Sequence, residues 1–404
     1  MDRQEMSALL PPLGGYLREF VDCFVRSEPL EHLSAYVSGQ LSDLRRKSIA
    51  PMAELAGMPP RTLQHFLSRH VWDEELMLDI LQQIVAREYQ HPRSIGIIQE
   101  RCHLKKGDNT PGVCREWCNT TSRPQNCIAT VHLGYAAGDF HCLLDGELFL
   151  PESWADDRRR CRSAGIADEM LYRTKWQIAF DMYQRAVANG MRIQWLTFDE
   201  RYGQSREFLA QLDDRGQRYV AEVPRTFTGW LIAPKSLRKG RYQSMAWPRR
   251  HRRPRPKSTT PECIENLCRR SDQVQERPWK TARIEDGSTR RIVWQAKAAR
   301  FYFEHHGSGI SPHLLIFARD PGTPTEIRYF VSNAKEGTSL QMLLAVTFRG
   351  QRMERCLGDE MNQLGLSHFE VRNYLSLRRH LILTAVSHLF LAKVHHMSRG
   401  ETRL

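Results

Sequence analysis

An acidic residue that follows an apolar run in the middle of the chain is a candidate for chemistry. The run covers residues 193–198 and is typical of a buried strand, and Asp199 stands directly after it. A carboxylate at the end of such a strand lies at the rim of the sheet, where the strand meets a loop that can hold a ligand. The alternatives are a helix N-cap before Ser205 and an ordinary surface acid, and the residues alone leave all three open.

A second chemical feature is a stretch of a single charge sign. Residues 235–257 hold ten Lys or Arg and no acidic residue. The densest part of this stretch has four arginines, Arg249, Arg250, Arg252 and Arg253. Cations spaced in this way on a flexible loop can follow a phosphate backbone, and we favour such a clamp over a solvated linker.

The charge of the whole chain also indicates a polyanionic partner. Its 404 residues include 59 Lys or Arg against 46 Asp or Glu, so that nucleic acid is the partner expected. Apolar residues at 41% and charged residues at 26% exclude a wholly disordered chain, a collagen and a coiled coil. No apolar stretch reaches 18 residues and the N-terminus is polar, so we expect a cytoplasmic protein without a membrane span or secretory signal.

Ten cysteines at irregular spacing are expected to be free thiols of a reducing compartment. Cys114, Cys118 and Cys127 are the nearest approach to a zinc site, but a second tight pair at finger spacing is missing from the sequence. We therefore favour core cysteines over a zinc site.

The periodicity of apolar residues predicts which elements must position these groups. Residues 17–89 have helical spacing, and within them 52–67 reads as helix, Gly-Pro turn, helix, the order of helix-turn-helix DNA readers or of a plain helical hairpin. Strands follow from residue 94 to 150, and the strand at 193–198 is flanked by predicted helices. Further strands are predicted at 219–223, 281–297 and 314–331, and further helices at 339–346 and 375–394. This order predicts an α/β fold with a mixed sheet and helices on its faces.

Five segments, in this order and spacing, resemble the DDE transposases of bacterial insertion sequences. The resemblance covers about residues 15 to 395, and its segments are GIIQE at 96–100, LKKG at 104–107, LFLPESW at 148–154, TFDERYG at 197–203 and LGLSHFEVR at 364–372. It implies a ribonuclease-H-like α/β fold with an N-terminal helical domain and a β-rich insertion before the catalytic glutamate. The domains implied are a DNA-binding domain at 1–92, a catalytic domain at 93–225 and 336–404, and the insertion at 226–335.

The resemblance also implies an activity. Three acids of the family hold two Mg²⁺ ions, for which Mn²⁺ can substitute, and the ions promote cleavage of DNA at the element's ends and strand transfer to target DNA. The partners implied are the terminal inverted repeats and target DNA, with a homodimer that joins two ends and is associated with the nucleoid when bound.

Carried over position by position, the second acid is Asp199 and the glutamate is Glu354, with Glu370 as a weaker alternative. The first acid position is occupied by Gln99, followed by Glu100 as a possible substitute. A neutral amide cannot bridge two cations, and the loss of a charge pair about 4 Å apart is worth on the order of 4 kcal/mol, or about a thousandfold in rate. Glu100 is expected to point to the opposite face of the strand.

Two more positions depart from the family pattern, because Met361 replaces a Lys that touches the DNA end and Gly350 replaces an Arg. We therefore expect a weakened or dead catalytic centre. The function predicted is a DDE transposase with this impairment. The alternatives are an inactive transposase-derived DNA-binding protein, acting as repressor or architectural factor, and a phosphodiesterase on the same fold.

Several other side chains are candidate DNA contacts. Lys105 and Lys106 follow the first predicted catalytic strand and could touch phosphate. Trp154 could stack on a flipped base, although a place in the core is the favoured role for most of the nine Trp. Arg378 and Arg379 belong to the last predicted helix, which we expect to cover the catalytic sheet and to line the DNA path.

Overall fold

The computed structural model describes residues 11–118, 123–234, 260–285, 291–304 and 312–401. The packing divides the chain into two compact units: Met1–Ile193 with Arg352–Leu404, and Gln194–Gln351. The basic stretch at 235–257, with its four arginines, lies outside the described residues.

The first unit begins with helices whose apolar sides pack together. They are η1 (Arg18–Cys23), α2 (Glu28–Leu41), α3 (Ile49–Leu55), α4 (Pro60–Ser68) and α5 (Glu74–Glu88). The predicted order of helix, turn and helix is present, with α3 and α4 joined by a turn in which Gly57 has a positive φ of 67°, an arrangement shared by helix-turn-helix DNA readers and plain helical hairpins. Glycine adopts this conformation without a steric penalty.

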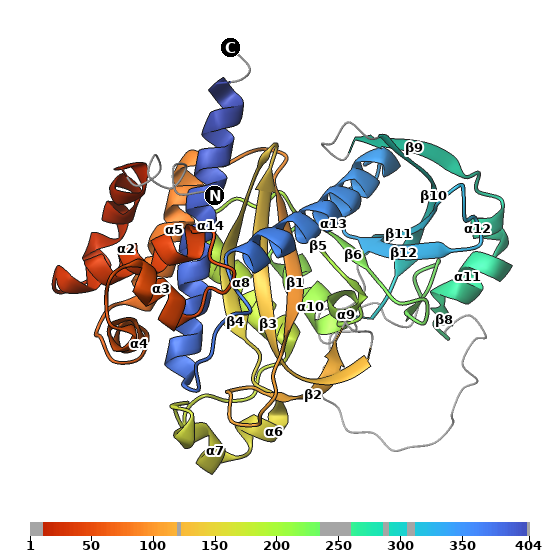
Figure 1. The fold of residues 1–404 in the computed structure, drawn as a ribbon. Coiled ribbons are helices and arrows are strands. Elements are labelled where there is room, and N and C mark those ends of the chain that lie inside the picture. Colours follow the sequence, from red (N-terminus) through yellow and green to blue (C-terminus); the bar gives the residue numbers. More distant parts are fainter. Residues whose placement is uncertain (1–10, 119–122, 235–259, 286–290, 305–311, 402–404) are drawn as a thin grey trace, which may run out of the picture. The chain divides into compact units, whose positions relative to one another are not determined.

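A sheet built around one long strand forms the centre of the first unit (Figure 1). Its strands are β1 (Ile95–Leu104), β2 (Cys114–Cys118), β3 (Arg123–Ala137) and β4 (Phe140–Leu148). β3 pairs antiparallel with each of the other three. The three consecutive strands expected from the sequence after residue 94 are therefore an antiparallel set, with β2 as an additional short strand.

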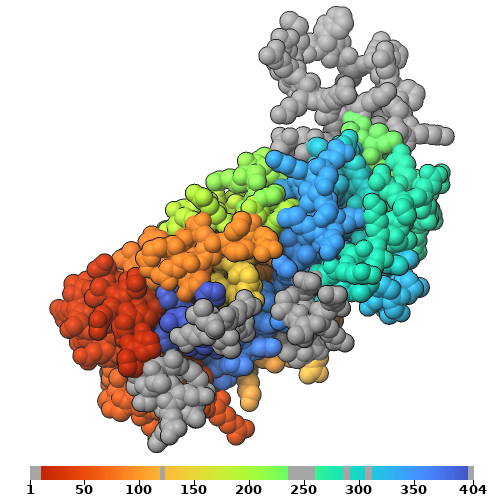
Figure 2. Space-filling model, turned by 90° about the horizontal axis from the view of Figure 1, so that it is seen from above, coloured from red at the N-terminus to blue at the C-terminus, as the bar shows by residue number. Residues whose placement is uncertain are grey.

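The remaining helices of this unit are α6 (Glu152–Ala155), α7 (Arg158–Ser163), α8 (Lys175–Ala188) and α14 (Tyr374–Glu401). α14 contacts β4 on one side and the N-terminal helices on another, as the dark blue helix in Figure 1 shows. Polar contacts as well as apolar ones join it to α2, because Gln40 Nε2 donates to Thr384 Oγ1 at 2.9 Å. The N-terminal helices thereby belong to the same unit as the sheet, and they are exposed at its surface (red in Figure 2).

The second unit has a mixed sheet with the strand order β5-β6-β12-β11-β10-β9. Its elements are β5 (Trp195–Phe198), α9 (Glu200–Gly203), α10 (Arg206–Asp214), β6 (Tyr219–Glu222), β7 (Thr228–Gly229), β8 (Glu262–Cys263), α11 (Ile264–Arg270), α12 (Asp272–Gln275), β9 (Lys280–Glu285), β10 (Arg291–Tyr302), β11 (Pro312–Arg319) and β12 (Ile327–Ser332). β5 and β6 are parallel and joined through α9 and α10, whereas β6, β12, β11, β10 and β9 are successively antiparallel. A mixed α/β architecture is thus observed, as predicted.

The helix α13 (Leu340–Gln363) crosses the division between the units, because residues up to Gln351 belong to the second and those from Arg352 to the first. It is much longer than the helix that apolar spacing predicted at 339–346. Among the described residues, no helix is long and apolar enough to cross a membrane.

Candidate functional site

Asp199 is found where the sequence predicted it, immediately after β5 in the second unit. It is the N-cap of the short helix α9, and its Oδ1 accepts from the Arg201 backbone N–H at 3.1 Å. Its Oδ2 accepts from Arg201 Nε at 2.8 Å and from Nη2 at 2.7 Å. Asp199 is therefore both a strand-end carboxylate and an N-cap, whereas Ser205 itself caps the next helix, α10.

A close backbone approach holds the Asp199 turn against the neighbouring strand. Gly203, the last residue of α9, lies so near to the Glu222 carbonyl oxygen of β6 that a Cβ there would be closer than real side chains come. Backbone oxygen atoms cannot rotate away as a side chain can. Only glycine therefore fits between Asp199's helix and β6.

The Gly203→Ala variant is expected to lose about 1 to 3 kcal/mol of stability, because the added methyl forces the backbone apart. Urea denaturation followed by circular dichroism measures this loss. Gly322→Ala is a matched control in the same unit, since the nearest atom to its added Cβ would be 3.4 Å away, and we expect a change below about 0.5 kcal/mol. Equal stability of the two variants would contradict the proposed role of Gly203.

Gln99, at the first acid position, belongs to β1 in the first unit and is 2% exposed. Its Oε1 accepts a hydrogen bond from Arg101 Nη2 at 3.0 Å. The same Nη2 donates to the backbone carbonyl of Glu354 on α13 at 2.9 Å. A guanidinium thus connects Gln99 to the backbone of the residue predicted to be the catalytic glutamate.

Arg101 was missed by the sequence analysis, although a signal was present. Residues two positions apart in a strand point to the same face, so Arg101 had to share a face with Gln99. Burial lowers the pKa of Arg101, and Glu354 and Asp359 act in the opposite direction. Arginine remains charged under such conditions.

Glu100 points away from Gln99, as expected from the alternation of a strand. Its carboxylate, with a side chain only 3% exposed, pairs with Lys175 Nζ at 3.1 Å. Lys175 also pairs with Glu116 of β2 at 3.0 Å. The remaining acid candidate, Glu370, is mostly exposed and forms an ion pair with Arg46.

The two departures near Glu354 are both packed into the protein. Met361 is fully buried, so its side chain has no surface to offer to DNA. Gly350, in the second unit, lies against the Thr197 side chain, and even a Cβ at this position would clash with it. A larger side chain could enter only if Thr197 moved.

Lys105 is held against the residue that precedes Glu370. Its Nζ donates to the Phe369 carbonyl at 3.0 Å and lies 3.6 Å from the centre of the Phe369 ring. Burial lowers the pKa of Lys105 to about 8. Lys106, in contrast, is exposed and remains a candidate phosphate contact.

Three other predicted DNA contacts occupy structural positions. Trp154 is 1% exposed, belongs to an apolar cluster and donates from Nε1 to the Val113 carbonyl at 2.8 Å. Arg379 is 4% exposed and bound to backbone carbonyls that follow α4. Arg378 pairs with Glu75 and Glu74. In this structure all three side chains contact protein groups.

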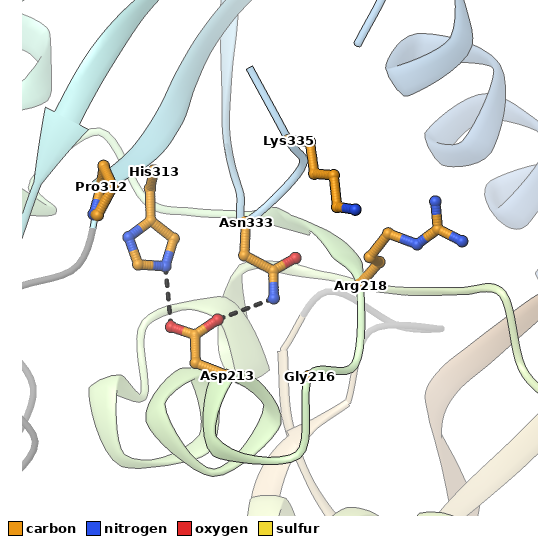
Figure 3. A pocket seen from close by; sticks show the side chains of 7 residues that line it. All are labelled: Asp213, Gly216, Arg218, Pro312, His313, Asn333 and Lys335. Atoms are coloured by element: carbon orange, nitrogen blue, oxygen red, sulfur yellow. Dashed lines mark hydrogen bonds and ion pairs between the residues drawn. The ribbon is translucent and has the colours of Figure 1, made fainter. Parts of the chain in front are cut away.

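A cavity of about 570 Å³ lies elsewhere in the second unit (Figure 3). Asp213 accepts from His313 at 2.9 Å and from Asn333 at 2.8 Å, with Arg218 and Lys335 beside them. Arg218 precedes β6, whereas Asp199 follows the parallel strand β5. The cavity is therefore at the N-terminal ends of these strands and Asp199 at their C-terminal ends. The sequence held no spacing signal for it, because its residues come from distant elements.

Across residues 11–401, apart from the gaps given above, no group of three or more His, Cys, Asp or Glu side chains could hold a metal ion. All ten cysteines are free thiols, as expected. At the first acid position a neutral amide bonded to a guanidinium does not fit a divalent ion, which prefers anionic oxygen.

Comparison with known families decides the relationship. The model of a family described as DDE superfamily endonuclease matches residues 19–291. The chain belongs to this family. DDE endonucleases generally use divalent metals, and the family resemblance drawn from the sequence motifs is thereby confirmed.

One relative of this chain has a more specific description. The chain is 27% identical over 188 residues to a probable transposase for insertion sequence element IS701 from Microchaete diplosiphon. The match covers 46% of this chain and 46% of the relative, so the chain spans about half of the length of that protein. The description of this relative agrees with the resemblance to insertion-sequence transposases that the sequence motifs indicate.

Proposed function

We propose that this protein is a ribonuclease-H-like DDE transposase that binds the terminal inverted repeats of its element and has an impaired strand-cleaving centre. The observation that supports impairment is Gln99, buried at the first acid position with its amide oxygen bonded to Arg101. The family relationship supports DNA as the partner. A homodimer that joins two DNA ends in the nucleoid belongs to the same proposal.

In this proposal Asp199 is the second acid and Glu354 is the third. A divalent metal, when bound, would lower the charge at the scissile phosphate and position the attacking oxygen. Asp199 lies at the end of β5, and Arg201 holds its carboxylate in one orientation. The first position gives no such anionic ligand, because Gln99 is neutral.

The impairment favours DNA binding over cutting as the activity of this chain. The loss of one carboxylate beside a cation is worth on the order of 4 kcal/mol at an effective dielectric constant of 20. Binding to a phosphate backbone does not depend on that carboxylate. The inactive DNA-binding protein, a repressor or architectural factor, is therefore the form of the proposal that the Gln99 environment favours.

The surface proposed to read DNA is the exposed face of α4, the second helix of the helix-turn-helix. Arg61, Gln64 and Arg69 are exposed on this face or directly after it, with His65 partly exposed between them. The helix has no acidic residue, whereas Leu63, Phe66 and Leu67 on its other face are buried. A helix of this kind can place basic and amide groups in the major groove.

Substitution of the α4 arginines tests this function. The Arg61→Ala and Arg69→Ala variants are each expected to weaken binding to element-end DNA by about 5- to 150-fold, which corresponds to 1 to 3 kcal/mol per base or phosphate contact. Fluorescence anisotropy at one fixed salt concentration measures the dissociation constant on end DNA and on shuffled DNA.

Arg93→Ala is the control for these variants, because Arg93 is exposed in the same unit and lies outside the helices. We expect less than a threefold change for it, as for surface substitutions in general. If the unaltered protein binds end DNA no better than shuffled DNA, the proposed function is wrong. If the Arg61→Ala and Arg69→Ala variants change the dissociation constant on end DNA no more than Arg93→Ala does, the choice of α4 is wrong.

A further inference from the structure

The positively charged Arg101 side chain lies beside Gln99, the residue at the first acid position. We propose that the Arg101 guanidinium is a built-in cation that replaces a divalent ion at the first acid position. This inference rests on the proposed function, in which Gln99 stands at that position. The contacts of the guanidinium are to the Gln99 amide oxygen at 3.0 Å and to the Glu354 carbonyl at 2.9 Å. One guanidinium nitrogen, Nη2, thus bonds oxygen atoms from both the first and the third predicted acid positions.

The position of Arg101 is built into the packing of the first unit. Gln99 and Arg101 share one face of β1, and the residue opposite Gln99 on β3 is His132. Gln99 is 2% exposed, and its Nε2 has no hydrogen-bond partner within the described part of the chain. The amide is therefore held by its oxygen alone, through the bond from Arg101.

The guanidinium also needs a space on the helix, and α13 provides it at Gly358. A Cβ built on Gly358 would overlap Arg101 Nη2. Any larger residue at this position would require the guanidinium to move from its observed place. The pair Arg101 and Gly358 therefore forms one fitted arrangement of strand and helix.

The charge of the Arg101 guanidinium opposes the binding of a second cation beside it. Burial lowers the pKa of Arg101, whereas Glu354 and Asp359 favour its charged form, and arginine does not lose its proton in proteins. A like charge at about 4 Å weakens the binding of even a monovalent cation on the order of a thousandfold at an effective dielectric constant of 20. A divalent ion is opposed at least as strongly.

Restoring the acid alone should therefore not restore the metal. In Gln99→Asp the new carboxylate lies beside a guanidinium that already faces it, and an ion pair forms in place of a metal site. Metal binding requires the second change, Arg101→Thr, which removes the charge and opens the space. Thr suits a strand position because β-branched residues pack well there.

The test measures binding of Mn²⁺ alone, by the loss of the EPR signal of free Mn²⁺ on titration. The full-length protein is compared with Gln99→Asp, Arg101→Thr and the double variant. We expect the double variant to bind Mn²⁺ at least tenfold more tightly than each of the other three. Gln99→Asp with Arg115→Thr is the control, because Arg115 is exposed on β2 in the same unit.

A second double variant, Gln99→Asp with Arg101→Gln, keeps the test valid if the Thr variant does not fold. Circular dichroism confirms folding in each case. Equally tight binding by Gln99→Asp alone, or by the unaltered protein, overturns the proposal. So does a folded double variant that binds Mn²⁺ no more tightly than Gln99→Asp.

Binding to element-end DNA, measured by anisotropy in EDTA, separates this proposal from the proposed function. The built-in cation predicts that the unaltered protein binds end DNA without metal, within twofold of its affinity in Mg²⁺. A requirement for metal in DNA binding overturns the built-in cation while leaving the transposase assignment intact. Failure to prefer end DNA under either condition refutes the assignment itself.

Discussion

Replacing Arg379 by alanine is expected to lower the free energy of unfolding by about 3 to 5 kcal/mol, the cost of removing one partner from a buried charge network. Arg379 is 4% exposed, and its guanidinium donates to the backbone carbonyls of His70 at 2.8 Å and Trp72 at 3.3 Å. It pairs with Glu74 at 3.1 Å and lies 4.4 Å from the Trp72 ring centre.

These contacts join the end of α4 to the start of α5. Without the guanidinium, carbonyl groups after α4 lose their donors and Glu74 loses its charge partner, while the side chain is buried too deeply for water to replace it easily. Two further carbonyl contacts, to Phe66 and Leu67 at 3.3 Å, are lost at the same time. The helix proposed to read DNA is the element that this change would loosen first.

Urea denaturation measures the effect, and the control is Arg372→Ala. Arg372 is exposed in the same unit, so that its loss should cost less than about 0.5 kcal/mol. A loss of under 1 kcal/mol in Arg379→Ala would show that Arg379 is not a structural residue. DNA affinity of the folded fraction then decides whether it is the DNA contact that the sequence suggested.

The second large effect concerns cutting. In Mg²⁺ the unaltered chain is expected to cleave element-end DNA at about a thousandth of the rate of the Gln99→Asp, Arg101→Thr variant, since about 4 kcal/mol in a barrier is about a thousandfold in rate. Adding Asp199→Asn to that variant is expected to abolish cutting, because the second anionic ligand is lost. A gel assay on labelled DNA that contains the element's own ends measures both rates.

Asp214→Asn in the same background is the matched control, because Asp214 is exposed at the end of α10 and should leave the rate unchanged. Cutting by the unaltered chain at the full rate would mean that an acid other than residue 99 supplies the missing first ligand. Glu100→Gln and Glu370→Gln would then identify it. Unchanged cutting with Asp199→Asn would refute the assignment of Asp199.

Much of the local structure was predictable, because apolar periodicity reports which side of an element is buried. The strand predicted at 193–198 is β5 at Trp195–Phe198, and the helix predicted at 375–394 is α14 at Tyr374–Glu401. The long run predicted at 314–331 is instead two antiparallel strands, β11 and β12. The run contains Pro321 and Gly322, which terminate a strand and allow the turn.

The contacts of individual side chains were less predictable than the elements that carry them. Arg379 is a candidate DNA contact by sequence, yet it is 4% exposed, whereas Trp154, at 1% exposed, has the place in the core that the sequence favours over base stacking. Helical spacing shows that Arg379 lies on a helix, but α14 is buried on nearly all sides, so it has no exposed face for periodicity to mark. The expectation for Glu100 fits the structure, because strand alternation is a local property.

The sequence by itself determined the family, the position of Asp199 after a buried strand, and the neutral residue at position 99. Each of these depends on residues close together in the chain, whose types and spacing are visible without a fold. Only the tertiary structure decided what these residues contact. Arg101 meets the Glu354 carbonyl 253 positions away, and Arg379 meets Glu74 at a separation of 305. Contacts at such separations form because packing buries these charges beside the few oxygen atoms that can neutralise them, and no local pattern encodes that choice.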